Sequence, residues 1–130
     1  MKIIKKTDCP VTQLPGRNLQ KIIGKESFSE SKKITFGLAT FSFDLGLPEP
    51  HQHAEEICYV LNCRNAYIHY GPAADKMGDL FSLEAGMSLH IPELEWHQFV
   101  CQEGGFADIL FIYGQVENIR PEEIIKGQQK

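Results

Sequence analysis

Short apolar segments separated by turn residues recur along this chain of 130 residues, and no stretch carries a long helical period. A series of short strands at close intervals is typical of an all-β sandwich or barrel. The segments expected to be strands cover residues 34–43, 57–61, 66–70, 80–83, 87–91, 96–101 and 106–113. We therefore predict an all-β fold.

The segments between and around these strands carry their own signals. Residues 62–65 (NCRN) are predicted to be a turn, and residues 71–79 (GPAADKMGD) a surface loop. The Pro-Gly turn in LPGR predicts that residues 1–28 form peripheral strands that cover a sheet edge or reach a partner subunit. Residues 118–125 (NIRPEEII) are expected to form a short helix beginning near Pro121, ahead of a frayed tail.

Length and composition set limits on the architecture and the class of protein. A chain of 130 residues is expected to be one domain with a core at about 34–113, large enough to fold without disulfides. The net charge of −4 offers no basic face, so we expect no nucleic-acid binding. No signal-like or membrane-spanning apolar run is found, which favours a cytoplasmic location without membrane contact. The four cysteines form no CxxC pair, so they are expected to remain thiols.

Histidines and acids gather in two short segments. His51 and His53 lie one residue apart in HQHAEE, and His97 follows the turn-like sequence PELE. On a strand, His51 and His53 would project to the same side, with a carboxylate from Glu55 or Glu56 just beyond them. Imidazole and carboxylate hold borderline divalent metals and leave coordination positions open for water or substrate. The pattern predicts a metal site.

Both segments resemble the sequence motifs of the cupin superfamily, whose small β-barrels hold a metal. The first motif is a glycine, HxH, three or four residues, Glu, six residues and a glycine. Its counterparts here are Gly46, His51, His53 and Glu56, with Cys63 in place of the last glycine. Two residues separate His53 from Glu56, one fewer than usual. Glu55, which has the strand parity of His51 and His53, therefore stays an alternative ligand.

The second cupin motif is a glycine, five residues, PxG, two residues and His. Gly86, Pro92 and His97 match it at full spacing, with Leu94 in place of the inner glycine. The resemblance covers about residues 34–113 and implies a double-stranded β-helix, a barrel of jelly-roll type. It also implies one divalent metal ion, of iron, manganese, nickel or zinc. The ligand set that it implies is His51, His53, Glu56 and His97.

The resemblance implies a small metal-dependent enzyme whose metal is the reactive centre, with dioxygenase, decarboxylase, isomerase or lyase chemistry on a small molecule. The alternative is a non-catalytic module that binds or senses a small ligand through the metal. For assembly we expect a symmetric homodimer, because residues 3–23 carry enough apolar side chains to pair across a subunit boundary.

Two further histidines and the neighbouring acids receive other interpretations. His90 alternates with apolar residues in 87–91 and is predicted to point away from the apolar face, and His69 has no acid or histidine at ligand spacing. We expect neither to be a ligand. Acids on the loops that flank the ligands would disfavour anionic substrates if they faced the cavity mouth. These acids are Glu49, Glu55, Glu93 and Glu95.

Overall fold

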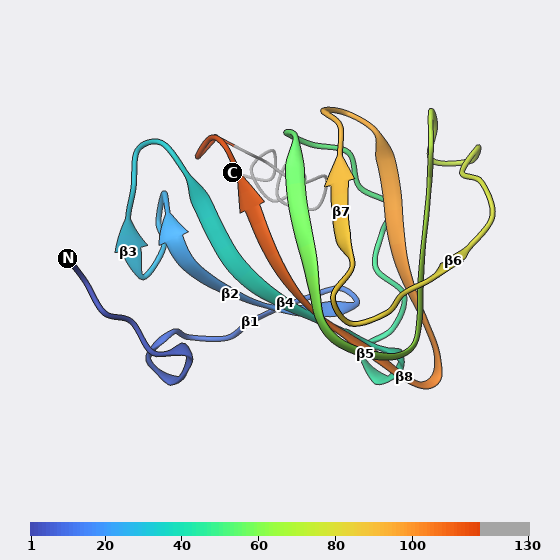
Figure 1. Cartoon of the computed structure of the whole chain (residues 1–130), viewed down its shortest axis with the longest axis horizontal. Helices are drawn as coiled ribbons and strands as arrows, with labels where there is room; N and C mark the ends of the chain where they lie inside the picture. The colour runs from blue at the N-terminus through green and yellow to red at the C-terminus, as the bar shows by residue number, and fades with distance from the viewer. Residues whose placement is uncertain (118–130) are drawn as a thin grey trace, which may run out of the picture.

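The structure, a computed structural model, describes residues 1–117. Its regular secondary structure is almost entirely β-strand (Figure 1), which confirms the all-β prediction. The predicted helix at 118–125 lies outside the described residues. No helix among residues 1–117 is long and apolar enough to cross a membrane. The elements in order are η1 (Lys6–Asp8), β1 (Thr12–Leu14), β2 (Arg17–Gly24), β3 (Ser29–Glu30), β4 (Thr35–Ser42), η2 (Phe43–Leu45), β5 (Glu56–Gly71), β6 (Phe81–Ser82), β7 (Ser88–Ile91) and β8 (Trp96–Tyr113).

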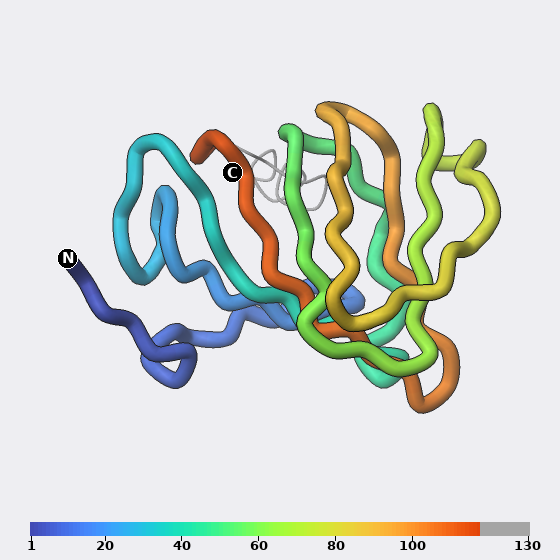
Figure 2. The backbone as a smooth tube through the Cα atoms, viewed as in Figure 1, coloured from blue at the N-terminus to red at the C-terminus, as the bar shows by residue number. Residues whose placement is uncertain are grey.

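Two long strands organise the sheet. Its order is β1-β2-β4-β8-β5-β6, with β3 paired to β2 and β7 paired to β5. Strands β5 and β8 run antiparallel along their whole length, from the pair Glu56 and Tyr113 to the pair Gly71 and Trp96. Both strands bend midway, so the sheet curls over and places two layers face to face (Figures 1 and 2). Functional side chains at distant points of the sequence can therefore meet between the layers.

The bend in β5 and β8 has a local cause. The register of β5 against β8 shifts between Val60 and Asn62 and again between Arg64 and Ala66, as at β-bulges, which turn a strand without reversing it. On β8, a Cβ added at Gly105 would lie 2.4 Å from the carbonyl oxygen of Asn65, so only glycine lets the strands approach there. The predicted turn at 62–65 is therefore wrong. Residues 96–101 and 106–113 are likewise one strand.

The amino-terminal segment forms part of the sheet and of the core. Strands β1 and β2 form a hairpin in which Leu14 pairs with Arg17, and Gly16 takes a left-handed φ of 78°, which confirms the predicted Pro-Gly turn. Strand β2, however, lies between β1 and β4, and its Leu19 is 1% exposed. The prediction that residues 1–28 are peripheral is wrong for β2, because this strand helps to build the core.

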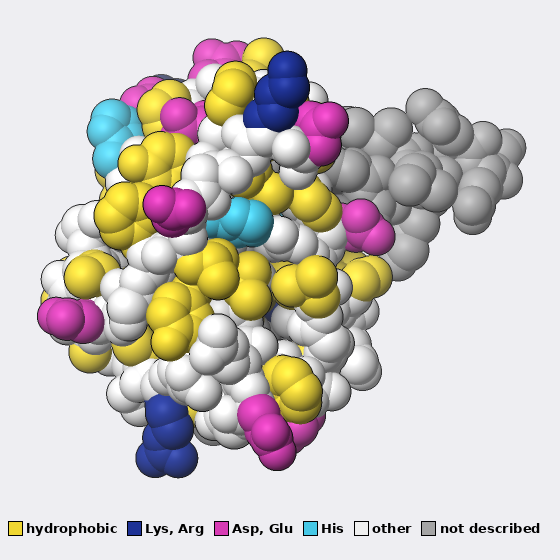
Figure 3. Space-filling model, turned by 90° about the vertical axis from the view of Figure 1, so that its right-hand side faces the viewer, with side chains coloured by type: hydrophobic (Ala, Val, Ile, Leu, Met, Phe, Trp, Pro, Cys, Tyr) yellow, Lys and Arg dark blue, Asp and Glu magenta, His cyan; other side chains and the backbone are white. Residues whose placement is uncertain are grey.

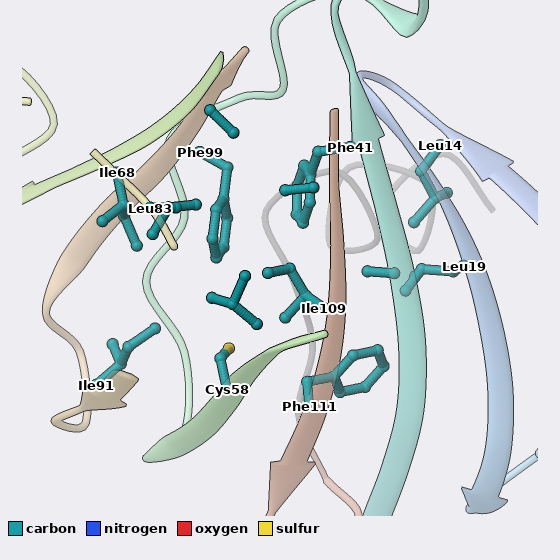
Figure 4. Packing of buried hydrophobic residues seen from close by; sticks show 14 of the residues in the cluster. Leu14, Leu19, Phe41, Cys58, Ile68, Leu83, Ile91, Phe99, Ile109 and Phe111 are labelled. Atoms are coloured by element: carbon teal, nitrogen blue, oxygen red, sulfur yellow. The ribbon is translucent and has the colours of Figure 1, made fainter. Parts of the chain in front are cut away.

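The core lies between the two layers. Phe41 of β4 and Phe99 of β8 stack across the interior with ring centroids 4.4 Å apart. Val60 and Ile109 are fully buried beside them. Figure 4 shows the apolar side chains from β1, β2, β4, β5 and β8 pointing toward one another, with Cys58 among them. This packing fills the middle of the barrel and forms the apolar wall of a cavity.

One side of the molecule exposes apolar rings. On the side formed by β6 and the second half of β5, hydrophobic side chains reach the surface (Figure 3). Tyr70 and Phe81 stack there with ring centroids 6.1 Å apart, and both are exposed. An exposed apolar patch of this kind is a surface that a second copy can cover. The homodimer stays a prediction.

Candidate metal centre

The four predicted ligands come from two strands and the segment before β5. Glu56 is the first residue of β5, and His97 is the second residue of β8. The backbones of His51 and His97 exchange two hydrogen bonds of 2.9 Å, which tie the segment to β8. The four side chains are buried and line one cavity, with exposures of 6% for His51, 6% for His53, 5% for Glu56 and 3% for His97.

The inward direction of His53 does not come from a regular strand. His51 forms an isolated bridge, and residues 52–55 lie outside the strands, so the expected alternation on a strand is wrong for this segment. Instead, the backbone N–H of Leu94 donates to the carbonyl of His53 at 2.8 Å. Leu94 has a left-handed φ of 64°, a conformation that favours glycine. The loop thus keeps the turn for which the motif usually supplies a glycine.

Three donor atoms converge inside the cavity. Nε2 of His53 lies 3.6 Å from Oε1 of Glu56, and Nε2 of His97 lies 3.8 Å from the same oxygen. One ligand atom from each of these three residues falls within 4.8 Å of the other two. Two imidazole nitrogens and a carboxylate oxygen this close together suit a shared metal ion, because each bonds such an ion at about 2.0–2.2 Å.

Backbone carbonyls hold a proton on Nδ1 of both rings. Nδ1 of His53 lies 3.0 Å from the carbonyl oxygen of Ala54, and Nδ1 of His97 lies 2.9 Å from that of Glu95. A carbonyl oxygen only accepts, so each Nδ1 carries the proton. In a neutral ring, Nε2 then holds a lone pair. This is the usual arrangement behind a metal-binding histidine, whose other nitrogen donates to a protein oxygen.

The ring of His51 lies next to these side chains but farther from the rings of His53 and His97 than these two lie from each other. Its ring centroid is 6.4 Å from that of His53 and 6.3 Å from that of His97, whereas the latter two are 4.9 Å apart. Its ring is buried and faces the same cavity. The role of His51 as a ligand stays a prediction.

The two candidate carboxylates point in opposite directions. The side chain of Glu55 is 64% exposed, and its Oε2 lies 2.6 Å from Nε2 of the equally exposed His90. Glu56 begins β5 and pairs with Ile91 and Tyr113, so it faces inward in step with Cys58. The parity that favoured Glu55 does not apply, because the strand begins only at Glu56.

The remaining predictions for nearby residues have mixed outcomes. His90 points outward as predicted, and His69 lies away from the cavity, with its Nε2 2.7 Å from Oε1 of Gln98. The condition that the flanking acids face the cavity is not met, since the cavity lining includes none of the four. An electrostatic preference against anions therefore has no basis in the cavity wall.

The cavity is small and largely aromatic. Its volume is about 30 Å³, and its apolar wall includes Phe41, Phe99 and Phe111. The ring of Tyr113 packs edge-on against His53, with centroids 5.1 Å apart. Sequence reasoning missed Arg17, which also lines the cavity and is 2% exposed. The signal for it was a cation directly after the Pro-Gly turn, at the start of a strand.

Sequence comparisons identify no relative, whereas structural comparisons do. No protein-family model and no curated protein matches the chain. Among solved structures, the polyketide cyclase RemF from Streptomyces resistomycificus is 23% identical, with a TM-score of 0.68 over 93% of this chain and 82% of that one.

Two larger proteins share the architecture. Hydroxypropylphosphonic acid epoxidase from S. wedmorenis is 13% identical, with a TM-score of 0.64 over 87% of this chain and 59% of that one. An oxalate decarboxylase from B. subtilis is 15% identical, with a TM-score of 0.64 over 95% of this chain and 35% of that one. Identities this low establish the fold alone. The protein has the cupin fold, as the two sequence motifs predicted, and its His-Glu-His group supports a metal ion.

Proposed function

We propose that this protein is a metal-dependent enzyme that acts on a small molecule, with the metal ion held by His51, His53, Glu56 and His97. The observation that carries the proposal is the convergence of three ligand atoms, from His53, Glu56 and His97, within 4.8 Å of one another inside a buried cavity. Two of these residues also have the fixed Nδ1–H tautomer that a metal-binding imidazole needs.

The structural neighbours support an enzyme without choosing the reaction. They are named as a cyclase, an epoxidase and a decarboxylase, which are three reaction types on one fold. Fold alone does not determine function, so the proposal extends only to small-molecule chemistry at the metal. Imidazole and carboxylate donors suit iron, manganese, nickel or zinc, and availability often decides which one is bound.

The residues around the site prepare it for catalysis. When bound, the ion would polarise a substrate oxygen or lower the pKa of a water ligand. The carbonyls of Ala54 and Glu95 hold the rings of His53 and His97 in orientation, so little reorganisation is needed on binding. The aromatic side chains of the wall lower the local dielectric constant, which strengthens electrostatic interactions inside the cavity.

The size of the cavity limits the substrate. A volume of about 30 Å³ gives room for about two or three water molecules. A bound ion and its open coordination positions would use part of that space. The substrate, or the part of it that reaches the metal, therefore consists of only a few non-hydrogen atoms.

Metal content and turnover together test the proposal. The chelator-treated protein is reconstituted anaerobically with iron, manganese, nickel or zinc in turn, and elemental analysis is expected to find about one ion per chain for at least one metal. The loaded protein is then offered small keto acids, sugars and catechols while oxygen consumption and products are followed. A folded protein that takes up no stoichiometric metal would refute the site. Stabilisation by a compound that is never converted would instead indicate a binding or sensing module.

A further inference from the structure

A buried guanidinium group shares the cavity with the candidate metal centre. Arg17 is the first residue of β2, and its side chain is on the same inward face as Leu19. It is 2% exposed, and arginine is buried to this degree almost only when it is paired. Its Nη1 donates a hydrogen bond of 3.0 Å to the carbonyl of Pro15, in the hairpin turn that precedes β2. The turn thus anchors the guanidinium at the cavity wall.

The charges of the cavity favour an anionic ligand. Among the described residues that line it, Arg17 brings one positive charge and the carboxylate of Glu56 one negative charge, so the two cancel. A bound metal cation then leaves the cavity with a net positive charge in a setting of low dielectric constant. Uncompensated buried charge is costly. An anion that enters with the substrate would offset this cost, whereas a neutral molecule would not.

The shape of the space favours a carboxylate over a bulkier anion. A guanidinium group is planar, and its fork of N–H donors matches the two oxygens of a carboxylate. The cavity of about 30 Å³ admits a ligand of few atoms, and the flat rings of Phe41, Phe99 and Phe111 form its wall. Such a space suits a small planar acid better than a tetrahedral anion with a large hydration shell.

We propose that Arg17 binds the carboxylate of a small organic acid, and that this contact selects the substrate class of the enzyme. The inference rests on the proposed function for the metal, because the surplus positive charge comes from the bound ion. Arg17 is then a specificity-determining residue that touches the substrate. The competing role for Arg17 is to neutralise and position Glu56, in which case its loss would weaken metal binding and leave ligand selectivity unchanged.

Calorimetric titration of matched ligands separates these roles. Glycolate and its neutral amide, glycolamide, are titrated into the metal-loaded and the metal-free protein, together with inorganic phosphate. The variants are Arg17→Gln, which removes the charge, and Arg17→Lys, which keeps it without the planar fork. Lys21→Gln is the matched control, because it removes a positive charge from an exposed position of the same strand. Elemental analysis of each variant reports its metal content.

The wild-type protein is expected to bind glycolate at least about tenfold more tightly than glycolamide. In Arg17→Gln, glycolate affinity is expected to fall by about tenfold to a hundredfold, with glycolamide affinity and metal content unchanged. Arg17→Lys should recover part of the loss, and Lys21→Gln should match the wild type.

Several outcomes would overturn the inference about Arg17. They are equal losses for acid and amide, a fall in metal content in Arg17→Gln, tighter binding of phosphate than of glycolate, or no binding of either ligand by the wild type. The metal content separates the failure of this inference from the failure of the proposed function. If no metal is taken up, the proposed function fails and this inference fails with it. If about one ion per chain is bound but the glycolate preference is absent or does not depend on Arg17, the inference about Arg17 alone fails.

Discussion

Replacing each of the two neighbouring acids at the start of β5 by glutamine tests the metal centre most directly. Glutamine keeps nearly the shape of glutamate and removes its charge. In Glu56→Gln the change affects the oxygen that lies 3.6 Å and 3.8 Å from the Nε2 atoms of His53 and His97. In Glu55→Gln it affects a side chain that is 64% exposed and pairs with His90. The two variants are thus a matched pair, adjacent in sequence and opposite in direction.

The expected loss of metal-induced stability follows from the linkage between metal binding and folding. Losing an outer partner of a metal ligand costs about 10–100-fold in metal affinity, so removing the charge of Glu56 itself should cost about a hundredfold or more. A ligand at about a thousand times its Kd stabilises the folded protein by about 4.1 kcal/mol. After a hundredfold loss, the same free metal concentration is about ten times Kd and contributes about 1.4 kcal/mol.

Thermal unfolding makes this difference measurable. For a domain of this size, 1 kcal/mol corresponds to roughly 4 °C in Tm. In a metal-buffered solution at about a thousand times the wild-type Kd, the metal-induced rise in Tm should be about 16 °C for the wild type and about 6 °C for Glu56→Gln. Circular dichroism with and without chelator gives both values for each variant.

The matched control decides between the two acids. Glu55→Gln should keep the wild-type rise within roughly 2 °C, because its side chain lies outside the cavity. A rise that is lost in Glu55→Gln and retained in Glu56→Gln would make Glu55 the ligand. Unchanged rises in both variants would refute the reasoning, since neither carboxylate would then contact the ion.

Three further predictions concern the histidines, a thiol and assembly. His51→Ala and His97→Ala should each lower metal content strongly while His69→Ala leaves it unchanged, and equal metal loss in all three by elemental analysis would show a wrong ligand assignment. Burial raises the pKa of the Cys101 thiol to about 11, with a smaller contribution from Cys63. Its thiolate therefore forms only as the pH rises, so alkylation followed by peptide mass spectrometry should accelerate about tenfold per pH unit between about pH 8 and 10; a plateau near pH 9 would contradict this. Sedimentation at micromolar concentration should give a dimer mass, and a monomer mass would refute the homodimer.

Much of the fold was predictable because its signal is local. Alternating apolar residues marked β4 and β7 within one or two residues of their ends, and the Pro-Gly pair marked the turn before β2. The metal-site prediction was local too, because a spacing of two residues and a trailing acid can be read without tertiary structure. His53, Glu56 and His97 indeed meet in one cavity.

The bends in β5 and β8 could not be predicted from periodicity. At Asn65 and Gly105 the sequence shows the polar and small residues that usually end a strand. In the structure these residues form bulges and a close contact between strands, which depend on the partner strand rather than on the segment itself. A turn that ends a strand and a bulge that bends a continuous strand have nearly the same local composition, so the sequence does not distinguish them.

The central position of β2 was not predicted because the strand lacks a clean apolar alternation. Arg17 and Leu19 are buried on its cavity face, whereas Gln20 is buried on the opposite face, against the amino-terminal segment. Hydrogen bonds take the place of apolar contacts, since Nε2 of Gln20 donates to the carbonyls of Lys6 and Cys9 at 2.9 Å and 3.0 Å. Deleting residues 1–21 would therefore remove part of the core and the cavity wall, and it would not serve as a test of dimer formation.

The pairing of β5 with β8 has a consequence for the order of folding. Glu56 pairs with Tyr113, which lies 57 residues further along the chain, and closing a loop of this length carries a large entropic cost before any contact repays it. Glu56 meets His97 only after these distant strands have aligned, so the ligand set does not exist in the unfolded chain. A metal ion bound there would stabilise contacts that form only late in folding. It would therefore lower the unfolding rate and leave the folding rate nearly unchanged.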